Sequence, residues 1–137
     1  MEIKMNESTH NRPEGKRLVD APAVFIAFDE QQAKLQNEVA WKKSDHNSIT
    51  VFKSGGTTTL MTAMHKDAIL EDLDTEGLLL LQVLDGCIGI TDDRDGARTI
   101  TDKQMMAVHL GRKLEVVAEK ESVVLLTIIR DVAGEIF

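Results

Sequence analysis

The stretch LLLLQVLDGCIGIT, residues 78–91, decides the fold class of this chain. It contains two short runs of β-forming residues, 78–84 and 87–91, which an Asp-Gly turn dipeptide separates. Similar runs, broken by Gly, Asp and charged residues at intervals of about ten positions, continue over most of the chain after Ser48. Many short strands without helices between them are typical of an antiparallel sandwich or barrel. The chain is therefore predicted to be mostly β.

The predicted strands fill the second half of the chain. They span residues 49–53, 57–65, 68–73, 78–84, 87–91, 98–101, 105–110, 113–118 and 122–130. Before them, residues 29–41 are rich in helix formers, begin with an Asp suited to N-capping and carry Leu35 and Val39 on one face. This pattern predicts one short helix. Residues 1–18 are polar and without an apolar period, so we expect a flexible N-terminal arm, and residues 19–137 then form a single domain.

Size and charge exclude several classes of protein. The 137 residues, 15.2 kDa, allow one domain, and 42% hydrophobic with 28% charged residues are globular values. A net charge of −7 and a pI near 5.0 disfavour a phosphate backbone or an anionic lipid surface, so neither nucleic acid nor membrane is an expected partner. Cys87 is the single cysteine, and no run reaches the roughly 18 apolar residues of a spanning helix. We therefore expect a cytoplasmic protein without an internal disulfide.

Two of the predicted strands are apolar on both faces. Leu78–Leu81 and Val123–Leu126 are uninterrupted apolar runs, so the core covers one face of each and a partner or another layer covers the second. We expect the chain to form a homodimer through such a face. By contrast, Leu114 alternates with the charged residues Lys113 and Glu115, as in a strand with one face in water. Leu114 is therefore expected to face the interior.

Several motifs follow one another in an order that resembles a known family. They are ITVFK at 49–53, AMHK at 63–66, QVLDG at 82–86, EVVAEKES at 115–122 and VVLLTI at 123–128. With a leader that contains NRPEG and DAP, the chain resembles the small single-domain cupins, the RmlC-like jelly-roll barrels, over residues 49–129. The resemblance implies a cupin-type antiparallel jelly-roll barrel, preceded by the short helix and the polar N-terminal arm.

The resemblance also implies where a cupin metal ion would bind. The ligand positions of the metal-binding cupins, aligned on the turn residues of the two motifs, fall on Glu71, Leu73, Leu79 and Leu114. Leucine offers no donor atom to a divalent cation and makes its surroundings drier, which raises the cost of holding a charge. We therefore expect that the usual metal site is absent and that no cofactor is bound.

The two histidines of the barrel region are the other candidates for chemistry. His65 and His109 could act as metal ligands or as an acid–base pair if their side chains met, but a partly exposed position at a strand end is the plainer interpretation. Cys87 is interpreted as a small hydrophobic residue, because no cation or imidazole lies near it in sequence. The DDRD stretch at 92–95 is interpreted as a solvated hairpin tip. No catalytic residue is predicted.

Three functions remain open from the sequence. The first, which we predict, is a metal-free barrel that binds a small, mostly apolar molecule. Its candidate ligand-binding residues are Glu71, Leu73, Leu79, Leu114, His65 and His109. The second is a divalent-metal-dependent cupin enzyme, such as a dioxygenase or an isomerase. The third is a dimerisation or interaction module whose barrel is filled with side chains, and the sequence does not separate it from the first.

Overall fold

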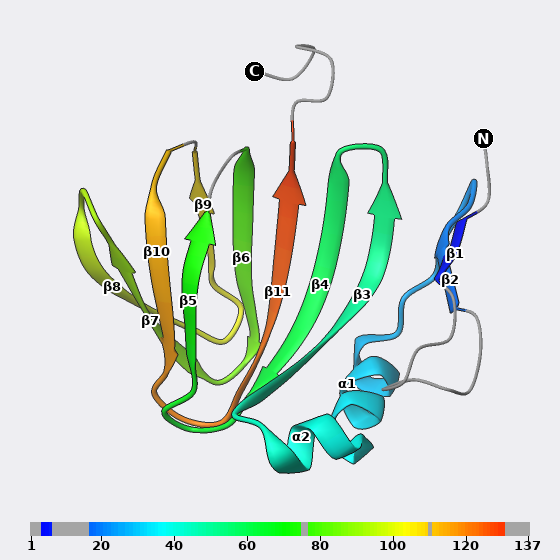
Figure 1. The fold of residues 1–137 in the computed structure, drawn as a ribbon, viewed down its shortest axis with the longest axis horizontal. Helices are drawn as coiled ribbons and strands as arrows, with labels where there is room; N and C mark the ends of the chain where they lie inside the picture. The colour runs from blue at the N-terminus through cyan, green and yellow to red at the C-terminus, as the bar shows by residue number, and fades with distance from the viewer. Residues whose placement is uncertain (1–3, 7–16, 75–76, 110, 131–137) are drawn as a thin grey trace.

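The computed structural model describes residues 4–6, 17–74, 77–109 and 111–130 (Figure 1). In this part of the chain, a hairpin of β1 (Lys4–Asn6) and β2 (Arg17–Asp20) precedes the helices α1 (Phe28–Asn37) and α2 (Val39–Lys43). The strands that follow are β3 (His46–Ser54), β4 (Thr57–Met64), β5 (Ile69–Asp74), β6 (Leu78–Asp85), β7 (Cys87–Asp92), β8 (Gly96–Thr101), β9 (Met105–Val108), β10 (Lys113–Ala118) and β11 (Ser122–Ile129). The chain is mostly β, as predicted.

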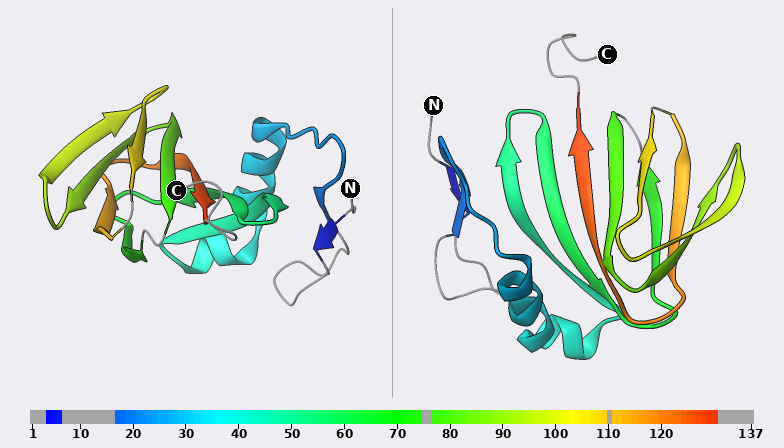
Figure 2. Two further views of the ribbon diagram at one scale, coloured as in Figure 1. Left: turned by 90° about the horizontal axis from the view of Figure 1, so that it is seen from above. Right: turned by 180° about the vertical axis from the view of Figure 1, so that it is seen from behind.

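The strands after α2 form two antiparallel sheets that face each other (Figure 2). One sheet has the order β3-β4-β11-β6-β9 and the other the order β5-β10-β7-β8. Most neighbours in these sheets are distant in sequence, as in a jelly roll, so the predicted barrel architecture is confirmed. Within the described residues, β8 and β9 each pair on one side only, and each therefore leaves a free edge.

The main hydrophobic core lies between the two sheets. Its buried members are Met64, Ala68, Leu79, Leu81, Val83, Ile88, Ile90, Ile100, Val108, Leu114, Val116, Ala118, Val124 and Leu126. Strand parity explains this set, because alternate residues of a strand point to the same face. On β10, Leu114 and Val116 are buried in the core, while Lys113 and Glu115 are exposed, as their alternation predicts.

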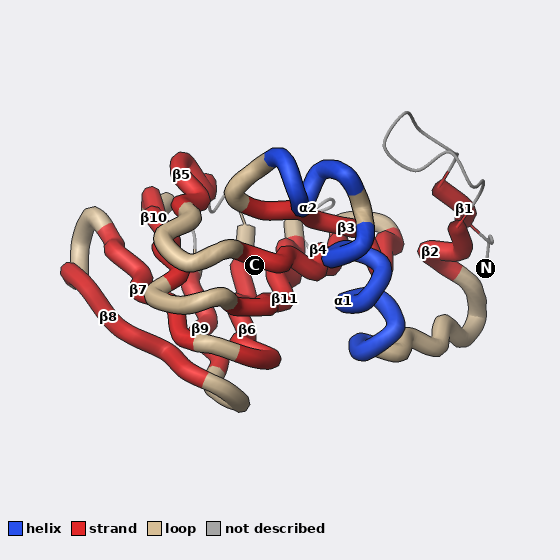
Figure 3. The backbone as a smooth tube through the Cα atoms, turned by 90° about the horizontal axis from the view of Figure 1, so that it is seen from below, coloured by secondary structure: helices blue, strands red, loops and turns tan. Residues whose placement is uncertain are grey.

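A second core lies outside the barrel, where α1 and α2 cover part of the outer face of the five-stranded sheet (Figure 3). There Val123 and Leu125 of β11 share a cluster with Leu35 and Trp41 of the helices. The second apolar face of β11 is therefore covered by the chain's own helical layer. On β6, by contrast, the outward side chain of Leu80 is only half-buried.

The helix predicted over residues 29–41 is two helices in the structure. Glu38 separates them with an extended backbone, φ −78° and ψ 152°. The side-chain amide of Asn47 on β3 donates 2.9 Å hydrogen bonds to the Leu35 carbonyl oxygen and to Oε1 of Glu38. The Leu35 carbonyl oxygen thus accepts from Asn47 as well as from the backbone N–H of Glu38, and α1 ends at Asn37. The contact from β3 could not be predicted from residues 29–41 alone.

The N-terminal hairpin lies beside β3. Arg17 Nη1 donates a 2.9 Å hydrogen bond to the carbonyl oxygen of Thr50, and Val19 is buried. Residues 7–16 lie outside the described residues, so the predicted boundary of the arm at residue 18 stays a prediction. Neither helix in the described part of the chain is long and apolar enough to cross a membrane.

Candidate functional site

Three of the predicted interior residues lie together at one end of the barrel. Leu114 pairs with Leu73 across β10 and β5, and both belong to the main core or pack against it, together with Leu79. Leu79 and Leu114 are 4% and 2% exposed. Strands β7 and β9 also end here, and we call this end the mouth of the barrel (Figure 1). The mouth is therefore lined on its inner side by leucine.

Glu71 does not lie with these leucines, so its prediction as an interior residue is wrong. The register between β5 and β10 shifts between Leu114 and Val116, which brings both Leu70 and Leu73 onto the inner face. A regular strand would have placed Glu71 and Leu73 on one face. The side chain of Glu71 is instead exposed and lines a cavity of about 300 Å³ together with Thr91, Asp93, Lys113, Leu114 and Glu115. That cavity lies on the outer side of the four-stranded sheet.

His65 also lies outside the barrel interior. Its ring stacks on the indole of Trp41, with centroids 3.5 Å apart and planes inclined by 16°. Its Nε2 lies 2.7 Å from the Trp41 carbonyl oxygen, within hydrogen-bond distance. His65 therefore fastens α2 to the end of β4. Its predicted position in the barrel interior is wrong, and a role in ligand binding stays a prediction.

His65 and His109 are too far apart to act as a pair. His65 follows Met64, which is opposite Ser122 at the start of β11. His109 follows Val108, which is opposite Leu79 on β6, and Leu79 is opposite Ile128 near the end of β11. The six-residue rise from Ser122 to Ile128 corresponds to about 20 Å at roughly 3.3 Å per residue. His109 is exposed at the mouth, at the opposite end of the barrel from His65.

Cys87 lies on the outer side of β7, where its Sγ is 3.5 Å from Oε2 of Glu119. Burial raises the pKa of the Cys87 thiol, and the hydrogen bond to Glu119 and the charge of that carboxylate raise it further. Both effects disfavour the thiolate, which is the nucleophilic form. Cys87 is therefore poorly suited to nucleophilic chemistry.

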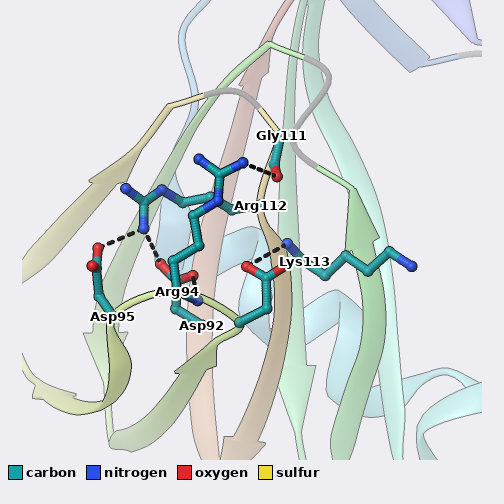
Figure 4. Close-up of polar contacts among 7 residues, drawn as sticks. Asp92, Arg94, Asp95, Gly111, Arg112 and Lys113 are labelled. Carbon is teal, nitrogen blue, oxygen red and sulfur yellow. Dashed lines mark hydrogen bonds and ion pairs between the residues drawn. The ribbon is translucent and has the colours of Figure 1, made fainter.

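A charged cluster that the sequence analysis missed closes the mouth (Figure 4). Asp92 is opposite Leu114, points inward and is only 5% exposed, so the prediction that all of residues 92–95 are solvated is wrong for Asp92. Its Oδ1 accepts a 2.9 Å hydrogen bond from the backbone N–H of Arg94, and its Oδ2 accepts one of 2.9 Å from Arg112 Nη1. Arg112 also contacts the exposed carboxylate of Asp95. The backbone N–H of Arg94 and then the guanidinium of Arg112 lower the pKa of Asp92.

The parity of β7 could have indicated the position of Asp92. Ile88 and Ile90 are the inward residues before it, and Asp92 continues their alternation. Its partner Arg112 is 20 residues away and was not expected from the sequence. The Arg94 side chain adds a second connection, because its Nη2 donates to the Gly111 carbonyl oxygen at 3.3 Å. The β7–β8 hairpin is thereby attached to the segment that leads into β10.

A groove lies along the free edges of β8 and β9, and we call it the seam groove. Its larger part, about 550 Å³, is lined by Arg98, Thr99, Ile100, Gln104, Met105, Met106 and Ala107. Its smaller part, about 150 Å³, is lined by Asp92, Asp95, Met106, Ala107, Val108, His109 and Arg112. The two parts share Met106 and Ala107. The seam groove therefore continues from the middle of β8 to the charged cluster at the mouth.

The larger part of the seam groove contains one cationic side chain. Arg98 is opposite the core residue Ile90, so it shares the inner face of the sheet, but its side chain is exposed because β8 is an edge strand. Within the described residues, Arg98 makes no side-chain hydrogen bond or ion pair. Gln104 accepts hydrogen bonds through Oε1 from the backbone N–H and the hydroxyl of Thr101, at 2.8 and 3.2 Å. This orientation leaves its amide nitrogen as a donor.

Comparison with known proteins identifies the architecture. No protein-family model and no curated protein matches this chain in sequence. Among solved structures, an RmlC-like cupin of Desulfovibrio desulfuricans aligns with a TM-score of 0.56 at 18% identity, over 80% of this chain and 94% of the other. A cupin-2 domain protein of Shewanella frigidimarina aligns with a TM-score of 0.59 at 13% identity, over 77% and 94%. This chain has the fold of a small cupin domain.

A larger protein shares this cupin fold in part. The salicylate 1,2-dioxygenase of Pseudoaminobacter salicylatoxidans aligns with a TM-score of 0.64 at 9% identity, over 74% of this chain and 32% of the other. At such identities the likeness shows the fold alone. Any chemistry of this chain therefore has to be argued from its own side chains.

The residues of this chain at the implied ligand positions do not fit a metal ion. Leu73, Leu79 and Leu114 supply no donor atom, and Glu71 is exposed on the outer side of the sheet. In the described part of the chain, no group of three or more His, Cys, Asp or Glu side chains could hold a metal ion. The inward carboxylate of Asp92 is already engaged by Arg112. No reaction step is assigned to a metal ion here.

Proposed function

We propose that this cupin domain is a metal-free binding protein that takes a small molecule in the seam groove. The observation that carries the proposal is the volume of the larger part of that groove, about 550 Å³. Ligand clefts in proteins typically measure about 300 to 1,000 Å³ and combine apolar walls with a few polar groups. In the seam groove, the apolar walls are Met105, Met106 and Ile100, and the polar groups are Arg98 and Gln104.

In this proposal the interior of the barrel is a packed scaffold and holds no ligand. Its inward side chains belong to one continuous cluster, and at the mouth Leu79 and Leu114 are almost fully buried. Protein interiors of this kind reach the packing density of organic crystals. We therefore propose a ligand site at the edge of the barrel, between the unpaired edges of β8 and β9, in place of the interior site expected from the sequence.

The absence of a metal is part of the same proposal. The leucines at the implied ligand positions support it, because they replace donor atoms with apolar contacts. They also speak against the alternative of a divalent-metal-dependent dioxygenase or isomerase. We also propose a cytoplasmic location. The single cysteine supports it, because disulfide-rich chains are typical of oxidising compartments.

Methyl NMR on protein labelled at the methionine methyl groups tests the proposed site directly. The probes are a panel of soluble fragments that includes short aliphatic acids, amides and alcohols. Met105 and Met106 line the groove, whereas Met61 and Met64 are fully buried in the two cores. We expect binding fragments to shift the first pair of methyl signals and to leave the second pair unchanged. Shifts confined to Met64, in the barrel interior, would place the ligand there and contradict the proposal.

A groove-filling substitution supplies the matched control. Arg98 lines the groove from the inner face of β8, and its neighbour Ala97 does not, although both are exposed. Arg98→Trp is expected to abolish the shifts that neutral as well as charged fragments induce, and Ala97→Trp is expected to preserve them. Equal fragment binding by the two variants would show that the groove is not the binding site.

A second candidate function is a dimerisation module, and one row of side chains favours it. Phe52, Thr59, Thr127, Leu80 and Ala107 are successive cross-strand neighbours over the whole width of the five-stranded sheet. We call them the outer row. All five are exposed or half-buried in the single chain, and each is either apolar or threonine. A second copy packed on the outer row would bury it, which agrees with the homodimer expected from the sequence.

A further inference from the structure

We infer that the ligand of the seam groove is an organic monoanion whose carboxylate pairs with the guanidinium of Arg98. This inference rests on the proposed function and names the chemical class of its ligand. The chain as a whole carries a net charge of −7. Arg98 is nevertheless the only charged residue among those that line the larger part of the groove within the described residues. The local charge is therefore opposite to that of the molecule.

The position of Arg98 makes its guanidinium suited to a ligand. Ile100, the next inward residue of β8, is 5% exposed and closes the core, whereas Arg98 is exposed beyond it. No described side chain takes the charge of Arg98 as a hydrogen-bond or ion-pair partner. A guanidinium binds a carboxylate through two parallel N–H···O bonds, and such charge-assisted bonds are among the strongest in proteins.

Gln104 supplies a second donor to the same part of the groove. Thr101 holds the carboxamide oxygen, so the amide nitrogen is the atom left to donate. Met105 and Met106 follow directly in sequence and line the same space. Methionine side chains are flexible and adapt to apolar ligands of different shape. A carboxylate between Arg98 and Gln104 would thus have its apolar body against the two methionines.

The other end of the groove limits the ligand to one negative charge. Asp92 and Asp95 line the smaller part, and both contact the guanidinium of Arg112. Two carboxylates around one guanidinium leave that end acidic. A second anionic group that reached it would be repelled. An uncharged tail is therefore expected to bind better than a second carboxylate.

Three six-carbon probes separate these statements. They are hexanoate, its neutral analogue hexanamide, and adipate, which carries a carboxylate at each end. We expect hexanoate to shift the methyl signals of Met105 and Met106 with an affinity about tenfold or more above that of the other two probes, as one charge-assisted pair implies. The measurement is a methyl NMR titration at constant ionic strength, because exposed charges are screened by salt.

Variants of Arg98 complete the test. Arg98→Gln is expected to lower hexanoate affinity to that of hexanamide, and Arg98→Lys to retain part of the difference. Lys53→Gln is the control, because it changes the net charge by the same amount as Arg98→Gln. Lys53 lies on β3, at the opposite edge of the five-stranded sheet from β9, so hexanoate affinity should be unchanged. If hexanamide binds as well as hexanoate, or if Arg98→Gln has no effect, this inference is wrong and the proposed function survives. If no fragment of any charge shifts Met105 or Met106, both are wrong.

Discussion

Leu114 and Asp92 lie directly opposite each other on β10 and β7, and both side chains are buried on the inner face of the barrel mouth. One is an apolar residue at a position where the cupin resemblance implies a metal ligand. The other is a carboxylate that is held by the backbone of Arg94 and by the guanidinium of Arg112. The mouth is thus closed by a packed leucine and an internally paired charge, whereas the guanidinium of Arg98 at the edge of the barrel has no hydrogen-bond or ion-pair partner among the described residues.

The pairing of Asp92 predicts a dependence of stability on pH. Hydrogen bonds lower the pKa of Asp92 in the folded chain, so its ionised form stabilises the fold above about pH 4, the region of an unfolded aspartate. This contribution is lost as the pH falls through the folded-state pKa. Asp92→Asn should therefore lower the Tm at pH 7, and the difference from wild type should narrow toward pH 3.

Circular dichroism melts at pH 7, 4 and 3 measure this difference. Glu115→Gln is the matched control, because Glu115 is an exposed carboxylate on the outer face of β10. It should alter the Tm little at any pH. A gap between wild type and Asp92→Asn that stays constant over this range would show that the Asp92 carboxylate does not contribute in this way.

The stack of His65 on Trp41 predicts a structural effect of His65 without a functional one. His65→Ala removes the ring contact and the hydrogen bond to the Trp41 carbonyl oxygen, with an expected cost of about 1 to 2 kcal/mol. The emission of Trp41, the single tryptophan, should shift at the same time. Hexanoate binding should be unchanged. If His65→Ala binds hexanoate more weakly while the Trp41 emission is unaltered, His65 contributes to ligand binding and this prediction is wrong.

The leucines at the implied ligand positions predict a metal-free protein. Elemental analysis of protein purified without added metal should find far less than one Fe, Mn, Ni or Zn per chain. A sample incubated with zinc and then passed through a desalting column should give the same result, because no described cluster could retain the ion. About one metal ion per chain that disappears in His109→Ala would contradict this expectation.

The outer row predicts a homodimer. Light scattering at micromolar concentration should give twice the chain mass of 15.2 kDa. Leu80→Glu places a charge within the row, beside its central residue Thr127, and should yield monomers. Leu18→Glu, at a residue that is 43% exposed on β2, should leave the dimer intact. A wild-type mass near that of one chain would exclude the dimer.

The sequence predicted those features that depend on alternation along one strand. The two-residue period of a strand predicts that Leu114 faces the interior. It also predicts that the apolar runs on β6 and β11 place apolar side chains on both faces of those strands. Glu71 was misplaced because a register shift against β10 changes the parity of β5, and such a shift depends on the partner strand.

The groove could not be predicted for a related reason. It exists because the edges of β8 and β9 leave a space between the two sheets, which is a property of the assembled barrel. Arg98 in isolation looked like any charged residue of a hairpin. The ion pair of Asp92 likewise depends on Arg112, which directly precedes β10 and reaches Asp92 because β10 pairs with β7.

The proposal that the ligand binds in the seam groove rests on a filled barrel interior, and Leu114→Ala tests most directly whether the interior is filled. Urea unfolding at fixed protein concentration should show a loss of about 2 to 5 kcal/mol, the usual cost of truncating a leucine in a packed core. Leu18→Ala removes the same atoms from a partly exposed site and should cost far less. A Leu114→Ala variant that unfolds at nearly the wild-type urea midpoint with an unchanged slope would show that Leu114 borders an open cavity. The ligand site would then lie inside the barrel.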